Sequence, residues 1–169
     1  MEIEKKLLNL EKLYLSKKKY YDDKYKIYWE GHDKNWNKRL GGTLRILKKI
    51  PTIKNTISSL NLNENATILD ICCGSPVLLH QIKNQFPKYN AYGIDIYTTE
   101  FDDFNENCLN GVKVFKFPFQ MLFENNHKFN SFDLVMMYNS YRAFNESLKN
   151  KIKNWSSDNS KYSLLDQYE

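Results

Sequence analysis

The sequence ATILDICCGS, residues 66–75, joins an apolar run to a turn of small residues. The run, residues 66–71, is mainly apolar rather than alternating, which is typical of a strand buried on both faces of a sheet. Asp70 stands near its carboxyl end, directly before the turn. Residues 75–86 then carry apolar side chains at helical spacing, so this stretch predicts a strand, a tight turn and a helix.

The same alternation continues along the chain. Further strands are predicted at 90–95, 112–115, 132–137 and 162–165, and further helices at 99–109 and 146–155. Strands separated by helix-length segments imply right-handed crossovers and a mostly parallel sheet. The fold class is therefore α/β.

The first 60 residues are predicted to be helical. One helix is centred on residues 7–15. A second begins near Trp36, is broken or loosened at the glycines 41–42 and is closed by Pro51. A short helix over residues 53–60 follows. We expect a helical N-terminal cap, residues 1–60, and an α/β domain, residues 61–169, in one compact unit.

Composition sets further limits. The 169 residues are 41% hydrophobic, enough for one domain with a core. No apolar run approaches the roughly 20 residues that span a bilayer, and no apolar region opens the chain as in a secretory signal. Three cysteines, two of them adjacent, form neither a disulfide framework nor a spaced zinc motif. These features predict a soluble cytoplasmic protein with no metal and no membrane partner.

The positive charge lies in the first third of the chain. The net charge is +5, and residues 1–60 hold 15 Lys and Arg against 7 Asp and Glu. A solvated lysine-rich helix surface is the ordinary explanation, and an RNA partner is the alternative that it leaves open.

In such folds ligands bind beyond the carboxyl ends of the strands. Two segments of the sequence are predicted to lie there: the turn after the first strand and the end of the second strand. The turn from Asp70 to Ser75 offers backbone N–H groups, and Gly74 lets the backbone approach a ligand. Asp95 ends the second strand and is placed to accept both hydroxyls of a ribose.

Residues 66–95 resemble the cofactor half of class I S-adenosylmethionine-dependent methyltransferases. The family's first motif is D-x-G-x-G-x-G, and this chain has DICCGSP from Asp70 to Pro76. The 25-residue interval from Asp70 to Asp95 fits the family, and FDLV at 132–135 resembles its fourth-strand motif. The resemblance covers about residues 55–166.

The resemblance implies a Rossmann-like sheet of order 3-2-1-4-5 and S-adenosylmethionine as cofactor. By position it assigns the methionine portion to the turn that holds Asp70, Cys72, Cys73, Gly74 and Ser75. It assigns the ribose to Asp95 and the adenine to Ile96, with Gln120 in the place of an acidic residue that contacts the adenine amino group.

The chain departs from the family pattern in three respects. Cys72 and Pro76 replace two motif glycines, and no acidic residue follows the third strand. The family's usual last two strands are lacking, so a homo- or hetero-oligomer that completes the sheet edge is expected as an alternative to a shortened or degenerate enzyme. A nicotinamide-binding loop is disfavoured, because a pyrophosphate needs more glycines for close approach.

Methyl transfer needs mainly alignment of donor and acceptor, and for some acceptors removal of a proton. The segment after the fourth strand supplies the candidate acceptor-side catalytic residues, Asn139, Tyr141 and Arg142. We expect methyl transfer to a small-molecule acceptor. A catalytically silent binding or regulatory subunit and an RNA methyltransferase are the two alternatives.

Overall fold

The computed structural model describes residues 2–26, 36–74, 76–96, 111–126, 128–129, 132–138, 141 and 144–165. At its centre is a five-stranded sheet in which every pair of neighbouring strands is parallel. The strand order is β3-β2-β1-β4-β5, as predicted. The strands are β1 (Thr67–Ile71), β2 (Asn90–Ile94), β3 (Val112–Phe115), β4 (Phe132–Met137) and β5 (Ser160–Leu165).

The first four predicted strands are confirmed to within one residue at each end, whereas β5 begins at Ser160, two residues earlier than expected. All five residues of β1 are buried, because this strand lies between β2 and β4 and is covered on both faces. The edge strand β5 instead leaves three of its six residues exposed. The burial of a strand therefore follows its position in the sheet. Because β1 is the central strand, the turn that follows it lies at the middle of the sheet's carboxyl edge.

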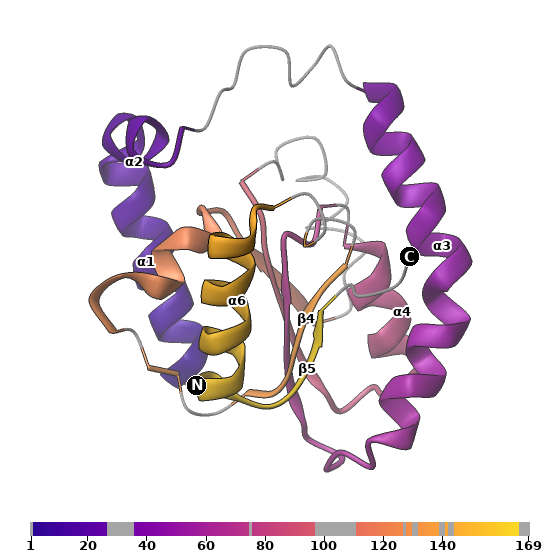
Figure 1. The fold of residues 1–169 in the computed structure, drawn as a ribbon. Coiled ribbons are helices and arrows are strands. Elements are labelled where there is room, and N and C mark those ends of the chain that lie inside the picture. Colours follow the sequence, from indigo (N-terminus) through magenta and orange to yellow (C-terminus); the bar gives the residue numbers. More distant parts are fainter. Residues whose placement is uncertain are drawn as a thin grey trace.

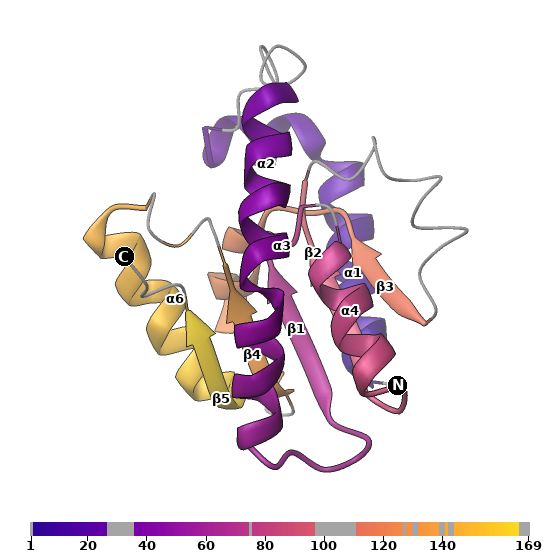
Figure 2. The same ribbon diagram turned by 90° about the vertical axis from the view of Figure 1, so that its right-hand side faces the viewer.

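The sheet lies between two layers of helices, seen edge-on in Figure 1 and with α3 and α4 toward the viewer in Figure 2. We call the two sides the α1 face and the α3 face. The α1 face is covered by α1 (Glu2–Ser16), the 3-10 helix η3 (Phe119–Asn126) and α6 (Glu146–Asn159), and the α3 face by α3 (Trp36–Ser59) and α4 (Val77–Gln85). Each face has its own cluster of buried apolar side chains, and both clusters draw on the first 60 residues.

Helix α1 is anchored at both of its ends. Near its start, Glu4 forms an ion pair with Lys113 of β3 at 2.6 Å. Farther along, the Lys116 backbone N–H donates a 2.6 Å hydrogen bond to the Glu11 carboxylate. At its end the buried Tyr14 hydroxyl donates to Asp22 Oδ1 at 2.7 Å, which ties α1 to α2 (Lys18–Lys24). The helix is therefore part of the layer over β2 and β3.

The predicted break in the third helix is wrong. α3 runs without interruption through the glycines 41–42 and through Pro51. A proline in a helix interior removes one backbone hydrogen bond and crowds the preceding turn. Here Ile50, Ile53 and Ile57 are at most 7% exposed in the cluster on the α3 face, and burial of this stripe outweighs the local cost.

Two other helices differ in extent from the predictions. α4 is shorter than the predicted 75–86, and α6 continues four residues beyond the predicted 155, since Ser156 and Asn159 are buried. The sequence pattern did not predict η3. The predicted helix over 99–109 lies outside the described residues.

Candidate functional site

The turn that follows β1 has a left-handed backbone at two positions. Cys72 has φ +57° and Gly74 has φ +54°. Such a conformation costs a residue with a side chain roughly 1–2 kcal/mol, whereas glycine adopts it freely. Cys72 thus keeps the backbone that a glycine would give, although it stands where the family's motif has glycine.

Two hydrogen bonds hold this turn against the end of β2. The Cys73 N–H donates to the Ile94 carbonyl at 3.1 Å, and the Gly74 N–H donates to Asp95 Oδ2 at 2.8 Å. The Asp95 N–H in turn donates to the Phe115 carbonyl at 3.1 Å. The turn and the ends of β2 and β3 are therefore joined into one edge of the sheet.

Asp70 is the next-to-last residue of β1, just before this turn, and is 3% exposed. Burial, and secondarily the charge of Asp95, raises the pKa of the Asp70 carboxyl well above its usual value. No described residue donates a hydrogen bond to this carboxyl. A buried carboxylate is stabilised by a cation or by donors, so this position is chemically suited to an ammonium group brought by a ligand.

The adjacent cysteines turn to opposite faces of the sheet. Cys72 packs against the cluster on the α1 face and Cys73 against that on the α3 face. Burial, with the neighbouring Asp95 and Asp70 carboxylates, raises the pKa of the Cys73 thiol well above its usual value. Cys73 is thus a protonated packing group and a poor nucleophile.

Gly93 is a site residue that the sequence analysis did not single out. A Cβ atom at this position would lie 2.8 Å from Cys73 Sγ and 3.0 Å from Leu79 Cδ1. Gly93 pairs with Asp70 across the two central strands. The absence of a side chain therefore lets the turn pack against β2. The only sequence signal was a glycine inside an otherwise apolar strand run.

Space beside Gly74 is open. A Cβ built on this residue meets no atom within 4 Å among the described residues, in contrast to Gly93. The turn lies between the Asp95 carboxylate and the buried Asp70 carboxyl. These groups suit a ligand that carries both hydroxyl groups and an ammonium group.

The predicted cofactor residues divide into three groups. The structure brings Asp70, Cys72, Cys73, Gly74 and Asp95 together, and Ile96 follows Asp95 directly. Gln120 lies on η3 and lines a groove between η3 and α6. Ser75 lies outside the described residues.

The predicted acceptor-side residues are described only in part. Tyr141 is half-buried against the cluster on the α1 face, and the Lys149 ammonium lies 5.9 Å from its ring centroid. Asn139 and Arg142 lie outside the described residues. The roles of all three stay predictions.

No group of three or more His, Cys, Asp or Glu side chains is arranged to hold a metal ion within the described part of the chain. The helices in the same part of the chain also include none with the length and apolar character that crossing a membrane requires.

The chain has a Rossmann-like fold of the class I methyltransferase type: a parallel sheet of order 3-2-1-4-5 has helices on both faces, and the turn after β1 is bonded to an acidic residue after β2. No protein family profile matches the sequence, and no curated protein matches it. Solved structures do match. One is a protein from Methanococcus maripaludis assigned as an S-adenosylmethionine-dependent methyltransferase, with 14% identity and a TM-score of 0.55 over 76% of this chain and 60% of that one.

Two further matches have lower TM-scores. The plantazolicin methyltransferase BpumL, solved with a monoazolic desmethylPZN analogue and S-adenosylhomocysteine, has 22% identity and a TM-score of 0.49 over 96% of this chain and 58% of that one. PKMT2 from Rickettsia typhi, solved with S-adenosylhomocysteine, has 23% identity and a TM-score of 0.44 over 54% and 18%. The chain thus spans less than two thirds of the length of each of these proteins.

Proposed function

We propose that this protein binds S-adenosylmethionine at the carboxyl edge of β1 and β2 and transfers its methyl group to a small-molecule acceptor. The observation that carries the proposal is that a buried Asp70 carboxyl, which accepts no hydrogen bond from a described residue, lies next to the turn that is bonded to Asp95. The fold supports it, because ligands of such sheets bind at this edge.

Each part of the site has a chemical counterpart in this cofactor. Asp70 would take the methionine ammonium, and the backbone of the turn would lie along the methionine chain. Asp95 would accept the ribose hydroxyls, since a carboxylate has two oxygens and can accept several hydrogen bonds beside that of the Gly74 N–H. The bound cofactor supplies an activated methyl group on sulfur, so the protein has mainly to align the acceptor.

The acceptor would lie on the β4 side of the turn. β4 is the other neighbour of β1, and Met136 pairs with Asp70 in the parallel register. The chain beyond β4, which includes Tyr141, therefore leaves the sheet beside the proposed donor site. This placement supports Tyr141 as an acceptor-side residue, and the same role for Asn139 and Arg142 is proposed from the sequence alone.

Calorimetric titration with S-adenosylhomocysteine tests binding. Asp95→Ala should weaken binding by about 1–3 kcal/mol, because a charged acceptor is lost. Asp95→Asn keeps an oxygen for the Gly74 N–H and should lose less. Asp133→Ala is the matched control: its carboxylate also accepts a 2.8 Å hydrogen bond from a backbone N–H, that of Thr67, at the opposite edge of the sheet. Absence of binding at millimolar ligand, or equal losses in Asp95→Ala and Asp133→Ala, would contradict the site.

Transfer is tested separately with methyl-labelled S-adenosylmethionine and two acceptor pools, cellular metabolites below about 1 kDa and total RNA. A small-molecule acceptor predicts label in the metabolite pool alone. Label in RNA would favour the alternative RNA methyltransferase, and stoichiometric binding without transfer to either pool would favour the catalytically silent subunit.

A further inference from the structure

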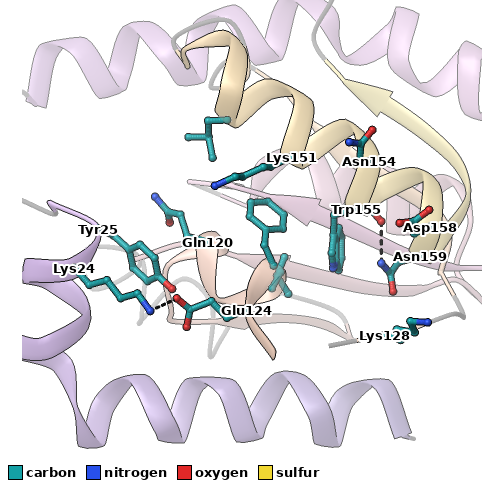
Figure 3. A pocket seen from close by; sticks show the side chains of 13 residues that line it. Lys24, Tyr25, Gln120, Glu124, Lys128, Lys151, Asn154, Trp155, Asp158 and Asn159 are labelled. Carbon is teal, nitrogen blue, oxygen red and sulfur yellow. Dashed lines mark hydrogen bonds and ion pairs between the residues drawn. The ribbon is translucent and has the colours of Figure 1, made fainter. Parts of the chain in front are cut away.

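A groove of about 880 Å³ lies between η3 and α6 on the α1 face (Figure 3), and no residue of the turn after β1 lines it. This volume is within the range of roughly 300–1,000 Å³ that is usual for small-molecule sites. Apart from Gln120, no residue that lines the groove belongs to the proposed cofactor site. The groove is therefore a separate candidate site.

The α6 wall is held in place by Asn159. Its Oδ1 accepts a 2.7 Å hydrogen bond from the Phe129 N–H, and its Nδ2 donates to the Trp155 carbonyl at 2.9 Å. The Trp155 ring meets Phe123 of η3 edge-on, with ring centroids 6.1 Å apart. These contacts give the groove a formed aromatic surface.

Trp155 also carries a buried polar group without a partner. The residue is 8% exposed, and its Nε1–H forms no hydrogen bond with any described residue. Leaving such a donor unsatisfied costs roughly 1–3 kcal/mol. The indole N–H can only donate, so what would satisfy it is an acceptor atom.

The charges of the groove favour a negative ligand. Three lysines, Lys24, Lys128 and Lys151, line it with two acidic residues, Glu124 and Asp158. Glu124 is neutralised by its ion pair with Lys24. Lys151 is in no ion pair with a described residue.

Lys151 reaches from α6 toward Gln120 and Tyr25 on the facing wall (Figure 3). Its ammonium, the Gln120 amide and the Tyr25 hydroxyl are all groups that can donate to an anion. Burial and the neighbouring Glu124 raise the pKa of Tyr25, so the hydroxyl keeps its proton.

We propose that the groove between η3 and α6 binds an organic anion with an apolar body. The body packs against Phe123, Leu148 and Trp155, and a carboxylate takes the donors of Lys151 and Gln120. A cationic ligand is disfavoured, because it would compete with Lys24 for Glu124 and would lie close to Lys151.

The experiment follows the indole N–H signals of ¹⁵N-labelled protein by NMR during titration with three probes of similar shape. The probes are 4-phenylbutyrate, 4-phenylbutan-1-ol and 4-phenylbutylamine. The chain has three tryptophans, and Trp155→Phe assigns the signal of interest. If that variant unfolds, Trp29→Phe and Trp36→Phe assign it by elimination. The anion should shift the Trp155 signal saturably, with an affinity at least tenfold above that for the alcohol or the amine.

Lys151→Gln should weaken this binding at least fivefold. Lys153→Gln is its matched control, since Lys153 is an exposed lysine on the same helix that does not line the groove. No saturable shift, equal affinity for the neutral or cationic probe, or equal effects of the two lysine variants would overturn the proposal. Binding of S-adenosylhomocysteine should be unchanged in Lys151→Gln, and binding of phenylbutyrate should be unchanged in Asp95→Ala. The proposals for the two sites are therefore tested independently.

Discussion

The Gly74 N–H donates a 2.8 Å hydrogen bond to Asp95 Oδ2 and so joins the turn after β1 to the end of β2. The bond holds a carboxylate beside the turn, where Gly74 has a left-handed backbone and no atom of a described residue would lie within 4 Å of an added Cβ. The turn and the Asp95 carboxylate are thus held in place by a hydrogen bond within the chain, without a ligand.

Asp70→Asn should raise stability while it weakens cofactor binding. The folded-state pKa of Asp70 is raised, so ionisation of this carboxyl opposes folding. The penalty is absent below about pH 4, the ordinary pKa of Asp, and grows by about 1.4 kcal/mol for each pH unit as the pH rises toward the folded pKa. Denaturant unfolding at pH 4 and pH 7 should show the gain only at pH 7, whereas the exposed Asp158→Asn should show none. A loss of stability at pH 7 in Asp70→Asn would contradict this account.

Binding of S-adenosylhomocysteine should release protons. A ligand ammonium beside Asp70 lowers the pKa that burial has raised, so the carboxyl ionises on binding between the two pKa values. Calorimetry at one pH in phosphate and in Tris, which differ in ionisation enthalpy, measures the number released. Asp70→Asn should remove the difference between the buffers, and proton uptake by the wild type would be the opposite result.

Gly74→Ala should disturb binding more than an equally strained substitution elsewhere. A side chain at φ +54° costs roughly 1–2 kcal/mol of stability, and its methyl group would enter the open space beside the turn. Gly111→Ala is the control, because Gly111 has φ +76° but precedes β3 at the opposite edge of the sheet. Its new Cβ would lie 3.3 Å from Lys83 Cε, which is near the end of a flexible side chain and can shift. Chemical unfolding should show comparable losses for both, while titration with S-adenosylhomocysteine should show weakening for Gly74→Ala alone.

Gly93→Ala should destabilise the fold through Cys73. The new Cβ would lie 2.8 Å from Cys73 Sγ, and overpacking of this kind costs about 1–3 kcal/mol. Adding Cys73→Ala removes the sulfur and should recover part of the loss, which a double-mutant cycle measures as a coupling of about 0.5–3 kcal/mol. Cys72→Ala, whose side chain lies on the other face, should show no such coupling with Gly93→Ala.

Much of the fold was predictable because its signals are local. The apolar runs of β1 and β4 are bounded by turn residues, and both strands were located within one residue. Pro51 and the glycines 41–42 were misleading, because local propensity predicts a break where burial of one isoleucine stripe keeps α3 continuous. η3 was not predicted, since it is a 3-10 helix with about three residues per turn, whereas the spacing that predicts a helix has the α-helical period of about 3.6 residues.

The sequence by itself determined the alternation of strands and helices and the 25-residue interval from Asp70 to Asp95, and the family resemblance implied the order of the sheet. Only the tertiary structure decided how the turn packs on Gly93, which face each cysteine takes, and that α6 and η3 enclose a groove containing Lys151 and Trp155. The physical reason is the distance along the chain over which each signal acts. Periodicity and turn chemistry depend on residues close together in sequence, whereas burial, pKa shifts and the lack of a hydrogen-bond partner depend on atoms that are far apart in sequence.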